Sequence, residues 1–338
     1  MTPGIEGIMT AQHGLITRRQ ALVAGLAPEA IDRATRQGSW VIVRRGVYTT
    51  RERWKSLTRV EDVQLTRDRA ASLRIGRPHV MSHDSAALEL GLAILRAEPR
   101  LTHVTRPGVV GSHLRHGVKH HLAPYLLSQV VVAHGRPVLG PARTAADIAR
   151  EHGVVPGVVA FDSALRAGAE PLEVERAVSA MSYWPGVTVA RSAWDAADPG
   201  ADSVGETLSR LLVEALGHGR PETQFGLTDG TRTAWCDLRL GRQVYEFDGA
   251  VKYRRIEDGG LAKVDPTDVL WYEKQRQDWV CGFKLGMSRL VWDDVFGPRR
   301  EHTLRRLERE YLDTVARFGT SICDLRPYLV RRPRRRAA

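Results

Sequence analysis

The stretch WCDLRLGRQVYEFDGAVKY, Trp235 to Tyr253, carries the clearest structural pattern in this chain. Its residues read as two short strands joined at Gly241-Arg242, and a two-residue loop that begins with glycine is typical of a type II′ hairpin turn. Counting outward from this turn sets Asp237 directly across the ladder from Glu246. The pattern therefore predicts an antiparallel β-hairpin with two opposed acidic residues.

The two faces of the predicted hairpin differ in chemistry. Because side chains alternate along a strand, Asp237, Glu246 and Asp248 share one face. Opposed carboxylates with Cβ atoms about 4.5–5.5 Å apart destabilise a sheet unless a positive group lies between them. We interpret this face as a candidate site for a divalent cation. The other predicted face is apolar and holds Cys236, Leu238, Leu240, Tyr245 and Phe247.

The composition is that of a folded and strongly basic protein. The 338 residues are enough for two or three domains, and the hydrophobic fraction of 43% is ordinary. The net charge of +11 comes from 50 Lys and Arg residues. Arginine binds phosphate through a rigid fork, so this balance favours a nucleic-acid partner, although a genome rich in G and C produces the same bias.

The cysteine spacing and the hydropathy of the sequence limit the cellular compartment in which the protein is expected. Cys236, Cys281 and Cys323 lie far apart, a spacing that predicts neither a disulfide framework nor a structural zinc site. There is no run of about 18 apolar residues and no apolar segment after a basic N-terminus. We expect a cytoplasmic protein with no membrane partner.

Residues 13–50 predict a small winged helix-turn-helix. Thr17 caps a short helix, and a second helix begins at Pro28-Glu29 and ends near Gly38. A β-ribbon follows, so the second helix is the one expected in the major groove of DNA. The alternative is a module that mediates protein contacts only. The predicted DNA contacts are Arg33, Arg36 and Gln37 on the helix, with Arg44 and Arg45 at the ribbon tip.

The middle region, residues 56–195, is predicted to alternate helices and short strands. Ser82-His83-Asp84-Ser85 precedes a helical pattern, and helix capping is favoured over a hydrolytic triad because neighbours at a helix start do not converge on one atom. A group of histidines follows in SHLRHGVKHH. Its mixture with Arg115 and Lys119 favours a solvated basic strand or loop over a metal site. These histidines are His113, His116, His120 and His121.

Several motifs in this order resemble the AbiEi-type antitoxin family of type IV toxin–antitoxin systems. They are the helix-turn-helix with its GVY strand, SHDSAALELGL, RTAADIAR and VVAFDSALRAG, over roughly residues 10–170. The resemblance implies a DNA-binding transcriptional regulator that represses its own operon. It also implies that a nucleotidyltransferase toxin, often encoded nearby, is a partner to look for.

The C-terminal half begins after a polar linker near residues 195–203. A helix, three strands, a helix from Thr267 to Cys281 and a strand ending at Trp292 are expected, which is a small α/β layout. This order resembles the PD-(D/E)XK nuclease superfamily, and in particular the very-short-patch-repair endonucleases, over about residues 200–296. The matching positions are Glu206, Asp237, Glu246 and Asp248, with Lys274, Arg276 and Asp278 on the helix and Arg289 and Trp292 on the last strand.

The resemblance implies an Mg²⁺-dependent endonuclease of phage defence or DNA repair. Glu206, Asp237 and Glu246 would hold Mg²⁺, which would activate a water for phosphodiester hydrolysis. The chain departs from the family at Asp248, which stands where a lysine is usual. The implied catalytic set is thus Glu206, Asp237, Glu246, Asp248 and Lys252, with Lys274 as a second candidate lysine; Lys274 and Arg276 would contact DNA.

Each acidic residue also has a structural interpretation. Ser203-x-x-Glu206 is a capping box by itself, and Lys274 and Arg276 could form a solvated helix face. In that case the protein is an AbiEi-like regulator or antitoxin whose nuclease-like domain is inactive. We therefore expect an α/β multidomain protein: a winged helix-turn-helix (1–55), an AbiEi-like middle domain (56–195), a restriction-endonuclease-like α/β domain (196–325) and a disordered basic tail (326–338) that adds salt-dependent affinity for nucleic acid.

Overall fold

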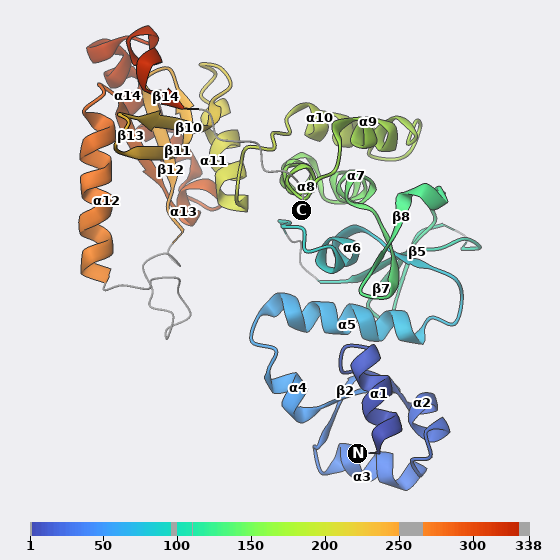
Figure 1. The fold of residues 1–338 in the computed structure, drawn as a ribbon. Helices are drawn as coiled ribbons and strands as arrows, with labels where there is room; N and C mark the ends of the chain where they lie inside the picture. The colour runs from blue at the N-terminus through green and yellow to red at the C-terminus, as the bar shows by residue number, and fades with distance from the viewer. Residues whose placement is uncertain (1, 96–99, 110, 250–265, 331–338) are drawn as a thin grey trace. The chain divides into compact units, whose positions relative to one another are not determined.

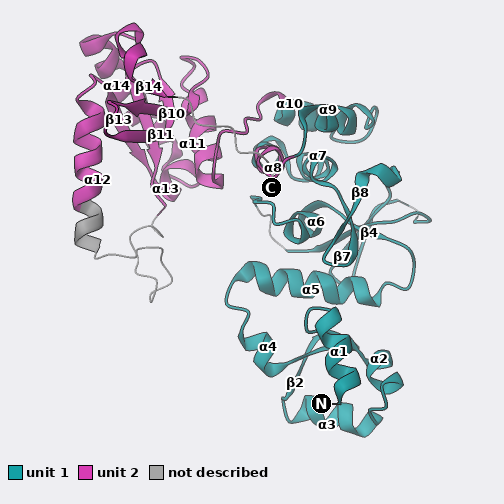
Figure 2. Ribbon diagram, viewed as in Figure 1, with its two compact units in different colours: residues 1–160, 169–194 teal, residues 161–168, 195–338 magenta. Residues whose placement is uncertain are grey.

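The structure is a computed structural model that describes residues 2–95, 100–109, 111–249 and 266–330. The chain forms two compact units (Figure 2). Unit 1 comprises Met1–Ala160 and Ala169–Trp194, and unit 2 comprises Phe161–Gly168 and Asp195–Ala338. Each unit contains helices and at least one sheet, which confirms the mixed α/β class.

The N-terminal part of unit 1 has the element order of a winged helix. Thr17 caps α2, because its hydroxyl accepts the N–H of Gln20 while the Gln20 side chain accepts the N–H of Thr17. Strands β1, β3 and β2 form a small sheet, with Ile31 of α3 in the core beneath it. The elements are α1 (Pro3–Ala11), β1 (Ile16–Thr17), α2 (Arg18–Val23), α3 (Pro28–Arg36), β2 (Trp40–Arg44) and β3 (Val47–Thr50).

The sequence pattern did not reveal α1. This helix precedes residue 13, where the predicted module began, and it buries Ile5 and Met9 in the same core as Ile31. Its nine residues include Gly4 and Gly7, which disfavour a helix, so it forms because the core of the winged helix covers Ile5 and Met9. The N-terminal module is therefore one helix larger than expected.

A six-stranded mixed sheet forms the centre of unit 1, in the order β6-β7-β5-β4-β9-β8. In Figure 1, α5 lies between the winged-helix elements and this sheet. Strands β5 and β7 are parallel neighbours, and α6 packs on β5. The strands are β4 (Val80–Met81), β5 (Thr102–Thr105), β6 (His113–Arg115), β7 (Val118–His121), β8 (Val130–Ala133) and β9 (Arg136–Leu139). The helices are α4 (Arg51–Lys55), α5 (Val60–Arg74), α6 (His83–Glu89), α7 (Pro141–His152), α8 (Val154–Arg166), α9 (Pro171–Ser179) and α10 (Val187–Asp195); α8 begins in unit 1, and its residues from Phe161 onward belong to unit 2.

Unit 2 is built on a five-stranded sheet in the order β13-β12-β11-β10-β14, in which only β12 and β13 are parallel. The structure has the predicted order of helix, three strands, helix and strand from α11 to β13, but the last strand ends at Leu290, and Trp292, expected on that strand, begins α13. The elements are α11 (Val204–Glu214), β10 (Glu222–Thr228), β11 (Thr233–Leu240), β12 (Gln243–Phe247), α12 (Pro266–Cys281), β13 (Gly286–Leu290), α13 (Trp292–Val295), α14 (Arg300–Phe318) and β14 (Leu329–Val330).

Strand β12 lies inside the sheet of unit 2, between β13 and β11, and helices cover both of its faces. Gln243 accepts a hydrogen bond from Thr314 of α14 on one face, and Glu246 binds Arg276 of α12 on the other. Gly205 of α11 lies against Phe247, where a Cβ would come within 2.1 Å of the ring. All five residues of β12 are consequently buried, as is expected for a strand packed on two sides.

The predicted basic tail is shorter than expected. Residues 326–330 were assigned to it, yet they belong to a 3₁₀ helix over Cys323–Tyr328 and to β14, which pairs with β10. The apolar residues Leu329 and Val330 allow this segment to form a short strand at the edge of the sheet. Residues 331–338, with the arginine run, lie outside the described residues.

Asp68 of α5 is a buried acid within unit 1. The Gln64 amide and the Thr102 hydroxyl donate to its Oδ1 at 2.7 and 2.8 Å. These donors are neutral, and no ion pair with a described Lys or Arg offsets the loss of water. Burial therefore raises the pKa of Asp68 from 3.8 to about 7.

We predict that Asp68 makes stability depend on pH. Its pKa is higher in the folded state than in the unfolded state, so stability is greatest below about pH 4 for this group and falls as pH rises to about 7, by at most about 1.4 kcal/mol per pH unit. Asp68→Asn should flatten the slope of urea-unfolding free energy between about pH 5 and 7. The exposed Asp195→Asn should keep the wild-type slope, and an equal slope in Asp68→Asn would contradict the prediction.

Candidate nucleic-acid interface and the acidic hairpin

The predicted hairpin has the expected register close to its turn. Leu240 pairs with Gln243 and Leu238 with Tyr245, and Gly241 has the positive φ of 57° that a type II′ turn requires. Farther from the turn, side chains replace ladder hydrogen bonds. Asp237 Oδ2 accepts the backbone N–H of Phe247 at 2.8 Å, and Arg276 donates to the carbonyl oxygen of Trp235.

The structure corrects the predicted position of Cys236. This residue lies in the buried cluster that contains Val244 and Val280, on the side of the sheet covered by α12, and not beside Tyr245. The neighbouring strand β10 places Phe225 opposite Cys236, and both residues belong to this cluster. Burial, with the charge of Glu246 second, raises the pKa of Cys236 to about 12, so its thiol is not a nucleophile.

An arginine occupies the position predicted for a cation at the hairpin. Arg276 Nη1 lies 2.9 Å from Glu246 Oε2 and Nη2 lies 2.6 Å from Oε1, a bidentate ion pair. Glu246 is 9% exposed. Burial lowers the pKa of Arg276, but its hydrogen bonds to Glu246 outweigh that effect and raise it. Arg276, expected to contact DNA, is thus engaged inside unit 2, whereas Lys274 on the same helix is exposed.

The other acidic positions are also engaged within unit 2. Glu206 Oε1 accepts the Ser203 hydroxyl at 2.9 Å, and its Oε2 accepts the N–H of Asp202 at 2.8 Å. The Ser203 side chain accepts the N–H of Glu206 in return, so Ser203 caps α11, but the backbone N–H that Glu206 accepts is that of Asp202 and not that of Ser203, as a complete capping box would require. Asp248 lies 3.5 Å from Arg289. Lys252 lies outside the described residues.

These contacts do not suit Mg²⁺. The ion requires several oxygen ligands directed at one point, but Glu246 is neutralised by an arginine and Glu206 binds its own helix start. Among the residues that the structure describes, one group of three side chains brings metal-ligand atoms within 4.8 Å of one another, and it consists of histidines in unit 1. The described contacts of the hairpin carboxylates therefore do not support a catalytic step there.

The predicted DNA-reading residues of α3 lie on its solvent side. Pro28 occupies the first turn and Ile31 anchors the helix in the core, which leaves Arg33, Arg36 and Gln37 exposed. Two of them are in the last turn, where basic residues also complement the helix dipole. The helix can therefore present cationic and amide groups to a groove.

The wing tip forms a basic pocket with the middle region of unit 1. Arg44 Nη2 donates to the carbonyl oxygen of His116 at 2.8 Å. Burial, then the nearby charge of Arg74, lowers the pKa of Arg44. The cavity has a volume of about 690 Å³, and none of its four arginines forms an ion pair with a described carboxylate. Its basic lining consists of Arg44, Arg45, Arg74 and Arg115, with the imidazoles of His116 and His120 beside them.

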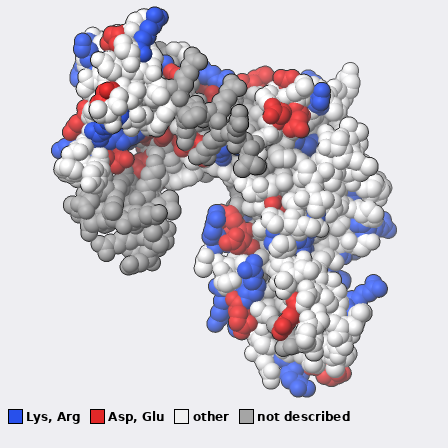
Figure 3. Space-filling model, in the orientation of Figure 1, with Lys and Arg blue, Asp and Glu red and all other residues white. Residues whose placement is uncertain are grey.

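Arg74 and Arg115 were not predicted as site residues. They come from the end of α5 and from β6, far from the wing in sequence, and only the packing of these elements brings them to Arg44. Figure 3 shows positive and negative side chains interspersed over the N-terminal part of the visible face. Neither a run of like charges nor the overall composition of the sequence could therefore have indicated this pocket.

Comparison with known families agrees with the N-terminal geometry. Residues 10–50 match the family model described as transcriptional regulator, AbiEi antitoxin. This segment covers α2, α3 and both strands of the wing. No curated protein matches the chain. No helix in the described part of the chain is long and apolar enough to span a bilayer.

We predict that the Arg276–Glu246 pair stabilises unit 2. Arg276→Met leaves a buried carboxylate without its partner and should lower the unfolding free energy by about 3 kcal/mol in urea denaturation. Adding Glu246→Gln should recover part of this loss, because no buried charge then lacks a partner.

The control is Arg299→Met, which removes an exposed pair with Asp293 and should change stability little. Equal stability of wild type and Arg276→Met would show that the pair has no structural role.

Proposed function

We propose that this protein is a sequence-specific DNA-binding transcriptional regulator of the antitoxin type. The observation that carries the proposal is the exposure of Arg33, Arg36 and Gln37 on the second helix of a winged helix-turn-helix that matches the AbiEi family model. Side chains on this helix would meet base edges in the major groove, where arginine recognises guanine and glutamine recognises adenine.

The basic pocket at the wing would supply contacts of a second kind. Four arginines without carboxylate partners repel one another, and a phosphate between them removes this repulsion. Phosphate contacts position a protein on the duplex but do not read its sequence. We infer that α3 discriminates among DNA sequences, whereas the pocket adds affinity for DNA of any sequence.

We propose that unit 2 resembles a nuclease in its order of elements but does not cut DNA. Its Glu246 and Arg276 neutralise each other, and its Glu206 accepts hydrogen bonds at a helix start. The same residues that would hold Mg²⁺ in an active domain serve here to fix α11 and α12 on the sheet. Unit 2 would then contribute binding or dimerisation.

We expect Arg33→Ala and Arg36→Ala each to weaken binding to DNA upstream of the protein's own gene by about 5- to 150-fold, the value of one good base contact. The loss should be much smaller on unrelated DNA of equal length. Gel shifts on both DNA molecules measure this difference. Arg309→Ala removes the same charge from an exposed position of α14 and should leave both affinities unchanged.

The pocket variants provide the contrast to the helix variants. Arg74→Ala and Arg115→Ala should weaken binding to both DNA molecules by the same factor. Each should also reduce the slope of log affinity against log salt concentration by about 1. Unchanged affinity in both pairs of variants would refute DNA binding by this module. If the pocket variants alone lost the preference for the upstream DNA over unrelated DNA, the assignment of sequence reading to α3 and of general affinity to the pocket would be refuted.

We expect supercoiled plasmid DNA to stay intact with the wild-type protein and Mg²⁺. Glu206, Asp237 and Glu246 are engaged in structural contacts, so among the described residues these carboxylates are not free to hold an ion that activates water. Agarose electrophoresis reports nicking. Mg²⁺-dependent nicking by the wild type that disappears in Asp237→Asn would contradict this expectation and establish the nuclease.

A further inference from the structure

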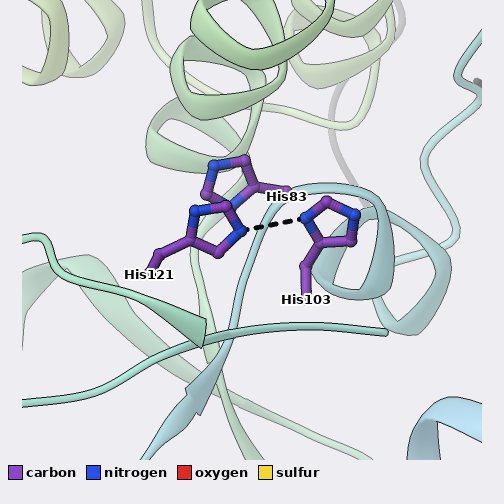
Figure 4. A group of neighbouring side chains, drawn as sticks. All are labelled: His83, His103 and His121. Atoms are coloured by element: carbon purple, nitrogen blue, oxygen red, sulfur yellow. Dashed lines mark hydrogen bonds between the residues drawn. The ribbon is translucent and has the colours of Figure 1, made fainter. Parts of the chain in front are cut away.

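Three histidines from separate elements of unit 1 meet in its interior (Figure 4). His83 is the first residue of α6, directly after β4, while His103 lies on β5 and His121 ends β7. Because β5 and β7 are parallel with Thr105 opposite His121, His103 and His121 point to the same side of the sheet. The start of α6 covers that side, and all three residues are 5% exposed or less.

The distances among these side chains are those of a ligand set. Each histidine offers a ring nitrogen within 4.8 Å of the other two. His103 Nδ1 and His121 Nε2 are 3.0 Å apart, and the rings of His83 and His121 stack at 3.8 Å between centroids. Two imidazoles bound to one tetrahedral ion at about 2.0–2.1 Å hold their nitrogens about 3.3 Å apart, so a small rotation of the rings suffices.

The chemistry of the surroundings keeps the imidazoles neutral, which is the form that binds metals. Burial lowers the pKa of His83 and of His103, and lowers that of His121 to about 3. Of the nearby cations, Lys119 pairs with Glu151, while Arg150 and Arg143 share the single carboxylate of Asp147. A dication would therefore meet three neutral donors.

Two local features around His83 fit a ligand position. The Ser82 hydroxyl lies 3.0 Å from His83 Nδ1 and orients the ring, as hydrogen-bonding partners of metal-bound histidines do. The backbone of His83 has a φ of 49°, in the left-handed region that residues other than glycine rarely adopt. Such conformations concentrate at functional sites, where surrounding structure fixes a side chain in place.

We propose that His83, His103 and His121 bind one divalent transition-metal ion of the Zn²⁺ type, with water in the fourth position. Imidazole ligands favour Zn²⁺ and its first-row neighbours over Mg²⁺ or Ca²⁺. The bound ion cross-links the start of α6 to β5 and β7. A fourth histidine, His152, lies 6.2 Å from His103 between ring centroids and is held by Asp84 at 2.9 Å, so it belongs to the outer shell of the site. This inference does not depend on DNA binding.

The test uses the tag-free full-length protein, stripped with a chelator and titrated with Co²⁺ and Zn²⁺. Calorimetry and the visible absorption of Co²⁺ should report one tight ion per chain with the spectrum of a tetrahedral site. His103→Gln and His121→Gln should each weaken binding at least tenfold. His116→Gln, in the exposed turn between β6 and β7, should bind as the wild type does.

Three results would overturn the proposal: no binding by the wild type, equal binding by His103→Gln, or an equal loss in His116→Gln. Far-UV circular dichroism checks that the variants fold. If the buried variants do not fold, thermal unfolding of the wild type and of His116→Gln decides, because an ion bound to the folded state raises Tm as its concentration increases. Tm values that do not respond to Zn²⁺ would then exclude the site.

Discussion

The buried ion pair between Arg276 and Glu246 is the interaction on which unit 2 depends. It connects α12 to the interior strand β12, and the same guanidinium donates to the carbonyl of Trp235 where the hairpin ladder is interrupted. A buried carboxylate at this place needs a positive partner, and the choice of partner decides the chemistry of the domain. An arginine supplies the charge without an open coordination site, so Glu246 of the acidic hairpin serves to hold α12 on the sheet.

Unit 1 shows the opposite use of charge. Its wing pocket gathers four arginines without described carboxylate partners, and its interior gathers three histidines kept neutral by burial. Strand β7 separates these two sites, because His120 lines the pocket while its neighbour His121 belongs to the histidine cluster. One strand therefore presents a surface suited to phosphate on one side and a buried ligand set on the other, as alternation along a strand requires.

Local patterns in the sequence predicted the elements better than their surroundings. The capping box at Thr17, the proline start of α3, the hairpin turn at Gly241 and the order of elements from α11 to β13 were all predictable, since each depends on residues close in sequence. The helix α1 and the strand β14 were missed, because α1 contains two glycines and β14 has only two residues, and both are stabilised by contacts with segments elsewhere in the chain. Strand β7 was expected to be solvated, but α6 and the rest of the sheet bury His120 and His121.

The sequence by itself determined the winged-helix module and the exposed positions of Arg33, Arg36 and Gln37 on its surface, because helix periodicity and caps are encoded within a few residues. It also placed Asp237 and Glu246 near each other across a turn. Only the tertiary structure decided what neutralises them, because Arg276 is 30 residues from Glu246 along the chain and reaches it by the packing of α12. The basic pocket and the histidine cluster were decided in the same way: their members come from distant segments that only the folded sheet and its helices bring together.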